Sequence, residues 1–236
     1  IVTQLWLGTS GNFAWLNWIT IVIALSVVPD SFYGLLIDST TTYGPTPIAF
    51  TVVVVALTVL VAVLSYWPVA NMMSHRQAMN ASFNKWHFVN TYGAFGTVTR
   101  TRREVIVEGT TDAVVTPATE WREYEFKGKP GDVYRRPRQY APYHLRLDWL
   151  MWFAGISRDY AAGWFPRFAG KLLENDPATV KLLRHNPFPD EPPRLVRARL
   201  FRYRFATHAE RRATGQWWMR DEIGDFMMPM ARDDLP

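Results

Sequence analysis

Cysteine is absent from this chain of 236 residues. Its absence excludes a disulfide bond, a zinc site with thiolate ligands and a cysteine nucleophile. It does not fix the cellular compartment, because a protein in an oxidising space does not need to use cysteine. Whole classes of mechanism are thereby removed, and nothing else in the sequence leads us to expect a metal or a cofactor.

Positive charge is missing from the first part of the chain. Up to residue 73 the only charged side chains are Asp30 and Asp38, and all 26 Lys and Arg residues follow, beginning at Arg76. The later part carries 26 basic residues against 19 acidic ones, the chain's 21 less these two aspartates, so its net charge is +7. A basic domain beside a membrane favours contact with membrane lipids, anionic ones in particular. We expect no nucleic acid partner, because zinc-binding spacing, a Gly-rich loop and lysine-rich runs are all missing.

One apolar stretch strongly predicts a membrane helix. Ile48 to Trp67 runs for twenty residues without a charge, about the length that crosses a bilayer core of roughly 30 Å. Its last two residues, Tyr66 and Trp67, suit a membrane interface. Pro68 is expected to end the helix.

A second, shorter apolar stretch covers residues 13–28. It contains Asn17, so we expect it to pack on other helices, with Asn12 as its cap and Pro29 as its end. The chain opens without Met, inside an apolar stretch, which we interpret as the end of an earlier span. Residues 1–70 are therefore predicted to be a membrane region with about two transmembrane helices, truncated at its N-terminus.

The remaining chain predicts an α+β membrane protein in which transmembrane helices are followed by a β-rich globular domain with packed helices. We expect a linker or interfacial helix over 71–86, the globular domain over 87–225 and a tail over 226–236. The predicted strands are HFVNTYGAF, REVIVEG, EWREYEF, RARLFRYRF and GQWWMRDEIG, and the predicted helices cover 147–154, 165–173 and 177–184. For the last helix, Asp176 is the expected N-cap.

Alternation within REVIVEG predicts a sheet with one solvated face. Val105 and Val107 point to one side, whereas Glu104, Ile106 and Glu108 point to the other. We expect the side with the two glutamates to face water.

Several long segments together resemble the lipase maturation factor family. They are FVNTYGAFGTVTRTRREVIVEGT, WREYEFKGKPGD, PYHLRLDWLMWFA, GKLLENDPATVKLLRHNPF and GQWWMR. The resemblance extends from about Thr9 to Arg220. It implies a polytopic membrane protein that, in animals, resides in the endoplasmic reticulum and helps dimeric lipases fold and assemble, with its globular domain facing the lumen.

The resemblance implies a client lipase, or another client protein, as the partner. Further membrane subunits are a second class of partner that the sequence leaves open. The chain departs from the animal members in lacking cysteines and the upstream spans. Its Arg-rich and Pro-rich composition suits a bacterial homologue. The expected location is the bacterial plasma membrane if the source is bacterial and the endoplasmic reticulum if it is eukaryotic, with the globular domain extracytoplasmic or lumenal.

The segment HLRLDW places three polar residues at alternate positions, His144, Arg146 and Asp148. In a structural interpretation, Arg146 and Asp148 pair with each other or with neighbouring backbone, or Asp148 caps the following helix. In a catalytic interpretation, His144 and Asp148 form an acid-base pair, but a second positioned group is not visible in the sequence. We favour the structural interpretation.

Other residues are candidates for binding. Asn90 and Tyr92 lie in a Gly-containing run where a ligand or a β-bulge would fit. Arg202 belongs to a series with Arg197, Arg199 and Arg204 that Leu200 and Phe201 interrupt, which indicates a bulge or a curved strand. Trp217 and Trp218 are adjacent, and neighbouring strand side chains point to opposite faces, so one indole is expected to be exposed.

Two classes of function remain open. We favour a membrane-anchored folding factor that recognises a client by its surface. The alternative is a membrane enzyme that acts on a lipid or a membrane-delivered substrate, with His144 and Asp148 as its acid-base groups.

Overall fold

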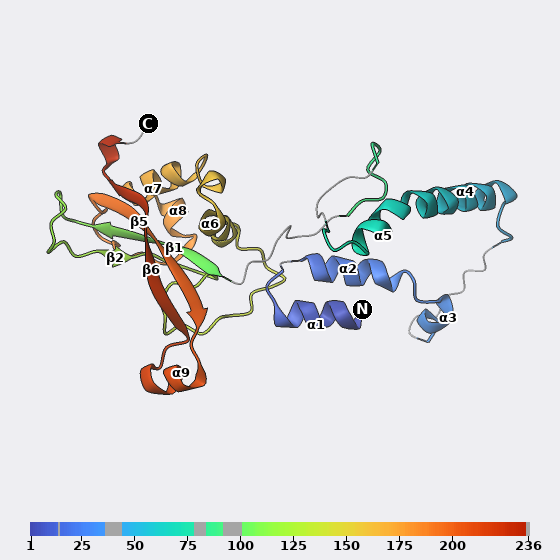
Figure 1. The fold of residues 1–236 in the computed structure, drawn as a ribbon, viewed down its shortest axis with the longest axis horizontal. Coiled ribbons are helices and arrows are strands. Elements are labelled where there is room, and N and C mark those ends of the chain that lie inside the picture. The colour runs from blue at the N-terminus through green and yellow to red at the C-terminus, as the bar shows by residue number, and fades with distance from the viewer. Residues whose placement is uncertain (14, 36–43, 78–83, 92–100, 235–236) are drawn as a thin grey trace. The chain divides into compact units, whose positions relative to one another are not determined.

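The computed structural model describes residues 1–13, 15–35, 44–77, 84–91 and 101–234 (Figure 1). Two compact units divide the chain: Ile1–Pro29 joins Thr101–Pro236 in the first, and Asp30–Arg100 forms the second. The first unit contains the β-sheet, and the second contains the longest apolar helical stretch.

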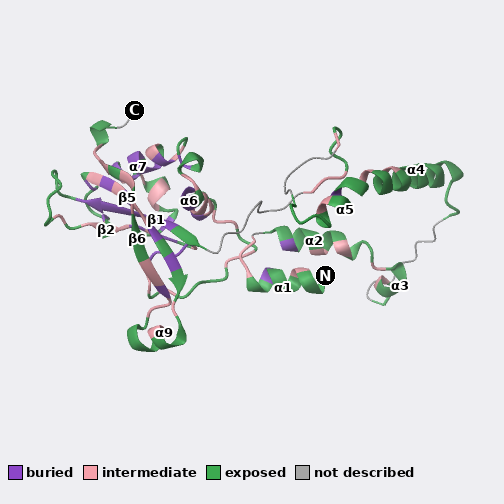
Figure 2. Ribbon diagram, viewed as in Figure 1, coloured by how far each residue is buried: buried purple, intermediate pink, exposed green. Residues whose placement is uncertain are grey.

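The helices of the second unit are α3 (Asp30–Tyr33), α4 (Ile48–Leu64) and α5 (Tyr66–Met72). Together α4 and α5 form a stretch of 25 residues that is long and apolar enough to cross a membrane, and 0% of its most apolar window is buried. Figure 2 shows this exposure along α4. Apolar side chains that the protein leaves uncovered favour another apolar environment, and a bilayer provides one.

Pro68 does not end this helical stretch, so the sequence prediction was wrong there. The break lies at Ser65, between α4 and α5, and Pro68 occupies the first turn of α5. Proline has no N–H to donate to the carbonyl of Leu64, and its ring crowds that oxygen. The helical hydrogen bonding is therefore interrupted about one turn before Pro68, between α4 and α5, and the helix continues after the proline.

Other predictions for this unit have mixed outcomes. For 71–86, predicted as a linker or an interfacial helix, the described residues favour the linker. Helix is confined to the end of α5, residues 73–77 and 84–86 form turns, bends and irregular backbone, and 78–83 lie outside the described residues. The predicted strand HFVNTYGAF is not formed over residues 87–90, and its part from residue 92 onward lies outside the described chain.

Two helices open the first unit, α1 (Val2–Ser10) and α2 (Leu16–Leu25). With 10 residues, α2 falls short of the roughly 20 that a span requires. Within the described ranges, one helical stretch rather than about two therefore has the length to cross a membrane. The buried Asn17 donates to Gln4 Oε1 at 2.7 Å, which confirms that this segment packs on another helix. Asn12 is not its cap and bonds the backbone of Arg138 instead, at 2.8 Å.

Four strands of the first unit form an antiparallel sheet in the order β2-β1-β5-β6. They are β1 (Arg102–Thr110), β2 (Arg122–Glu123), β5 (Leu195–Phe205) and β6 (Trp218–Met230), and a separate pair joins β3 (Glu125–Phe126) to β4 (Leu183–His185). The predicted α+β class is confirmed. The predicted tail over 226–236 was wrong in part, because β6 continues to Met230 and Phe226 packs against the core.

The helices of the globular region are α6 (Arg146–Ile156), α7 (Phe165–Leu173), α8 (Pro177–Val180) and α9 (His208–Thr214), with short 3-10 turns η1 (Arg158–Tyr160) and η2 (Arg232–Asp234). The bounds of α7 are those predicted, and Asp176 caps α8 by accepting from Thr179 N at 2.8 Å. The predicted helix over 177–184 was too long, because its last residues belong to β4.

The main core lies between the sheet and the helices α6 and α7 (Figures 1 and 2). Val105 and Val107 of β1 point into it, as predicted, and Met151 of α6 is fully buried there. Close packing of α6 depends on Gly155, because a Cβ at that position would lie 2.5 Å from the carbonyl oxygen of Arg103 in β1.

The opposite face of the sheet is also covered, which corrects the predicted solvated face. Glu104 is 0% exposed and Glu108 is 5% exposed. We define the strap as residues 127–137. It reaches this second face, where Val133 packs against Ile106 and its neighbours, and Tyr203 Oη donates to the carbonyl of Gly131 at 2.8 Å.

Two positive charges flank the buried Glu104, Lys129 from the strap and Arg102 from β1 itself. Lys129 Nζ lies 3.2 Å from Glu104 Oε2 and forms an ion pair with it, although the two atoms are not aligned for a hydrogen bond. Arg102 Nε lies 2.7 Å from Glu104 Oε1. Lys129 is itself buried and donates to the carbonyl of Val105 at 3.0 Å. Burial lowers the pKa of Lys129, whereas the charge of Glu104 acts in the opposite direction.

Candidate functional site

The loop between β5 and β6 contains a short helix with well-defined ends. Thr207 caps α9 by accepting from Glu210 N, and the Glu210 side chain accepts from Thr207 N in return, which is a capping box. The helix ends at Gly215, whose φ of 75° lies in the left-handed region that favours glycine, and Gly215 N donates to the carbonyl of Arg211 at 2.8 Å.

Glu210 also ties α9 to β5. Its two carboxylate oxygens accept from the guanidinium of Arg204, at 2.8 Å and 2.6 Å. This hydrogen bonding from Arg204, followed by that from Thr207, lowers the pKa of Glu210 to about 2. The charged carboxylate is therefore the form that holds the start of α9 in place.

Acid is expected to loosen α9. The pKa of Glu210 is about 2 in the folded protein, below that of an unfolded Glu at about 4.3. Its contribution is therefore complete above the unfolded value and is lost as the pH falls through the folded value. We expect amide exchange in α9 to accelerate as the pH is lowered from 5 to 2, after correction for intrinsic exchange. In Glu210→Gln the exchange should already be faster at pH 5 and should change less; an equal acid response in both proteins would contradict this.

The two adjacent tryptophans have different environments. Trp218, the first residue of β6, is 4% exposed, stacks on Phe205 with ring centroids 4.2 Å apart, and donates from Nε1 to the carbonyl of Arg135 at 3.2 Å. Trp217 is half-buried, and its backbone N donates to the carbonyl of Val133 in the strap at 2.8 Å. The pair is thus divided between the core and a partly open position, although neither indole is fully exposed.

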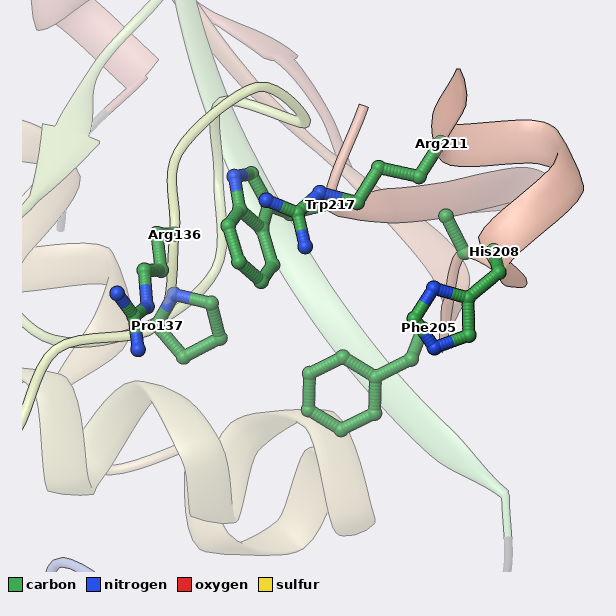
Figure 3. Close-up of a pocket in the computed structure, with 7 residues that line it drawn as sticks. Arg136, Pro137, Phe205, His208, Arg211 and Trp217 are labelled. Atoms are coloured by element: carbon green, nitrogen blue, oxygen red, sulfur yellow. The ribbon is translucent and has the colours of Figure 1, made fainter. Parts of the chain in front are cut away.

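Trp217 lies in a pocket of about 420 Å³ at one end of the sheet. Figure 3 labels six residues that line it, Arg136, Pro137, Phe205, His208, Arg211 and Trp217. The strap supplies the first two, and the β5–α9–β6 connection supplies the others. The Arg211 Cζ atom lies 3.3 Å from the centroid of the Trp217 ring, and the Arg136 Cζ atom lies 5.4 Å from it. Such stacking holds both guanidinium groups beside an aromatic wall.

The arginine series of β5 is neutralised within the domain. Arg197 pairs with Glu108 at 2.6 Å, Arg199 with Glu222, Arg202 with Asp221 at 3.1 Å and Arg204 with Glu210 at 2.6 Å. The register with β1 is continuous, so alternation places Arg197 and Arg199 on one face and Arg202 and Arg204 on the other. The predicted bulge exists in the pairing with β6. Arg202 therefore does not belong to a continuous basic stripe.

The segment HLRLDW does not form the predicted pair between Arg146 and Asp148. Arg146 is exposed, and no ion pair joins it to Asp148 in the described structure. Asp148 is 5% exposed, and its Oδ1 accepts from the backbone N of Gly128 at 2.6 Å and of Lys129 at 2.9 Å. Asp148 is the third residue of α6 rather than its cap. Its two hydrogen bonds hold the start of the strap against this helix.

His144 lies apart from this carboxylate arrangement. Its ring packs against Trp149, with centroids 5.4 Å apart. Asp148 Oδ1 is already occupied by two backbone donors, and neither residue lines the pocket at Trp217. Among the described contacts, His144 and Asp148 therefore do not meet in a common site.

Two binding candidates remain. Asn90 belongs to the second unit, and Tyr92 lies outside the described residues. Sequence reasoning missed Arg136, Phe205, His208 and Arg211 as neighbours of Trp217. One local signal was available, because Thr207 followed three residues later by Glu210 is typical of a helix start.

Known proteins match the whole length of the chain. The family description "Lipase maturation factor C-terminal domain" matches residues 88–229. Lipase maturation factor 1 of Bos taurus is 43% identical over 258 aligned residues, and that of Homo sapiens is 42% identical over 261, covering 100% of this chain in both cases. Lipase maturation factor 2 of Gallus gallus is 34% identical over 163 residues, covering 66% of this chain and 22% of its own length.

The chain spans about half the length of the two type 1 relatives, 46% of the bovine and 45% of the human protein. No solved structure matches it. Identity above 40% along all of this chain, together with the matched domain, identifies its family. The chain belongs to the lipase maturation factor family.

Proposed function

We propose that this protein is a membrane-anchored maturation factor that binds a client lipase through its globular domain. The observation that carries the proposal is the 43% identity to a lipase maturation factor 1 over 100% of the chain. The proposal concerns the activity of a whole protein of which this chain corresponds to about half the length of its relatives.

The stretch Ile48–Met72 supports the membrane anchor, because its length and composition suit a bilayer. We place the globular domain on the lumenal or extracytoplasmic side. The membrane would be that of the endoplasmic reticulum in a eukaryote and the plasma membrane in a bacterium. Membrane lipids, anionic ones in particular, and further membrane subunits would then be secondary partners.

Recognition of a client by a protein surface fits the site better than bond making does. The pocket at Trp217 combines an indole with two guanidinium groups, and Trp and Arg often dominate the energy of protein interfaces. Asp148, the carboxylate of the alternative enzyme, is buried and bonded to the strap. An acid or base needs a reacting atom within reach, and this carboxylate faces backbone instead.

Separate replacement of the two tryptophans tests the proposal. The tagged full chain, solubilised in mild detergent, is used to capture a purified dimeric lipase and, as a negative control, an unrelated secreted enzyme. We expect Trp217→Ala to reduce lipase capture while the melting temperature stays nearly unchanged, because this indole is only half-buried. Trp218→Ala should lower the melting temperature strongly, because deleting a buried Trp side chain costs about 3–5 kcal/mol.

Secreted lipase provides the functional measurement. The test uses cells that lack a maturation factor of their own. We expect them to secrete more active lipase when they express the whole protein that contains this chain than when they do not. Failure to capture the lipase, together with unchanged secretion, would overturn the proposed function. Normal capture by a folded Trp217→Ala variant would show that the client binds elsewhere on the domain.

A further inference from the structure

The pocket at Trp217 has an unbalanced charge. Arg136 and Arg211 line it, and neither takes part in an ion pair with a carboxylate within the described chain. The nearest carboxylate along α9, that of Glu210, is already bonded to Arg204 through both of its oxygens. The lining contains no acidic side chain. Two guanidinium groups held beside one opening therefore favour a ligand that carries negative charge.

The same pocket also has apolar walls. Phe205 is 63% exposed although its ring stacks on the buried Trp218. Pro137 and the ring of Trp217 form the facing side (Figure 3). When a partner covers an exposed aromatic ring, the apolar area removed from water stabilises the complex. The ligand should therefore present an apolar group close to its negative charge.

The rim of the pocket indicates that this ligand is a protein rather than a bilayer surface. The helix α9 has the sequence HAERRAT, in which alanine is the only apolar residue, and none of its residues is buried. A helix that lies in a membrane interface needs large apolar side chains along one face. Because α9 has no such face, the pocket suits a ligand that meets it in water.

We propose that this pocket binds an acidic segment of a protein in which Asp or Glu adjoins an aromatic or aliphatic residue. The carboxylate would lie between Arg136 and Arg211, and the apolar side chain would cover Phe205. The inference rests on the proposed function, in which the client lipase supplies the segment. It adds the chemistry of the recognised segment, which neither the family match nor the relatives' names specify.

The site is well ordered for this task. The capping box and Gly215 fix both ends of α9, and the bonds of Glu210 to Arg204 hold the helix against β5. Val133 accepts hydrogen bonds from the backbone N of both tryptophans, at 2.8 Å and 3.1 Å, so the strap is held to the same end of the sheet. A surface that is ordered before binding loses less conformational entropy when the ligand arrives.

Peptide binding by the full chain in lipid nanodiscs tests the inference. Fluorescence anisotropy compares a short labelled peptide containing Asp-Phe with matched peptides containing Asn-Phe and Asp-Gly. We expect the Asp-Phe peptide to bind about tenfold more tightly than either, because each change removes one of two cooperating contacts. Arg211→Gln and Arg136→Gln should each weaken the binding of the Asp-Phe peptide by a similar factor.

Arg212→Gln is the matched control, because Arg212 adjoins Arg211 on α9, is exposed and does not line the pocket. It should leave the affinity unchanged, and all three variants should keep the melting temperature of the parent. Equal affinity for the Asp-Phe and Asn-Phe peptides, or equal weakening by all three substitutions, would overturn the inference. So would normal peptide binding by both pocket variants.

Two further measurements separate the possible failures. In the first, phosphatidylserine vesicles compete with the peptide for the two pocket arginines. If they displace it from the parent but not from Arg211→Gln, the ligand of the pocket is a lipid headgroup and the inference is overturned. If the lipase is captured but the acidic peptide is not bound, the proposed function stands and the inference fails. If the peptide binds through Arg136 and Arg211 but the lipase is not captured and its secretion is unchanged, the inference stands for another protein and the proposed function fails.

Discussion

Replacement of Glu104 by Gln is expected to destabilise the globular unit by about 3–5 kcal/mol, because breaking a buried ion pair leaves its partner uncompensated. Glu104 is 0% exposed, and the side chain of Lys129 beside it is 2% exposed. Without the carboxylate, the ammonium group of Lys129 would lose its nearest counter-charge and would keep the carbonyls of Val105 and Pro130 as hydrogen-bond acceptors. Urea unfolding of the chain, followed by tryptophan fluorescence, measures the loss.

A chemically identical change on the surface gives the control. Glu120 is 82% exposed and lies 4.0 Å from Arg122, so Glu120→Gln should change the unfolding curve very little. Adding Lys129→Met to Glu104→Gln should recover part of the lost stability, since the unpaired buried ammonium is then removed. Equal effects of the two Gln substitutions would show that the buried ion pair does not stabilise the fold.

The burial of Glu104 and Glu108 shows where sequence reasoning stopped. Alternation along β1 placed both residues on the correct side of the strand, but it could not reveal what covers that side. Around Glu104 and Ile106 the strap covers this side, and the charge of Glu108 is balanced by Arg197 of β5 at 2.6 Å. Both partners are remote in sequence. A local pattern therefore predicts the orientation of a side chain but not its environment.

Elements with strong local signals were predicted more fully. The bounds of α7 were correct, and β5 was recognised from its alternating residues. The pocket was predictable only in part, because two adjacent tryptophans indicated an exposed aromatic residue, whereas Arg136 reaches Trp217 through the folding of the strap. The error at α8 has a similar cause: the end of the predicted helix pairs with β3 instead. Strand pairing overrode the local helical preference there.

Asp148→Ala is expected to destabilise the globular unit by about 3 kcal/mol or more, because it removes two hydrogen bonds to a charged acceptor and leaves two enclosed N–H donors without it. Those donors are the backbone N–H groups of Gly128 and Lys129, at 2.6 Å and 2.9 Å from Oδ1. The substitution thus acts on the position of the strap, although the residue itself belongs to α6.

Arg146→Ala distinguishes the bonding of Asp148 to the strap backbone from the ion pair between Arg146 and Asp148 that the sequence suggested. Arg146 is exposed, so its removal should leave the melting temperature nearly unchanged, whereas a buried pair would make both substitutions comparably harmful. Thermal unfolding of the two variants, measured side by side, distinguishes these results. Because the strap also carries Lys129 to Glu104 and Arg136 to Trp217, Asp148→Ala should weaken binding at the Trp217 pocket as well. A variant with normal stability and lost lipase maturation would instead return Asp148 to a direct role in function.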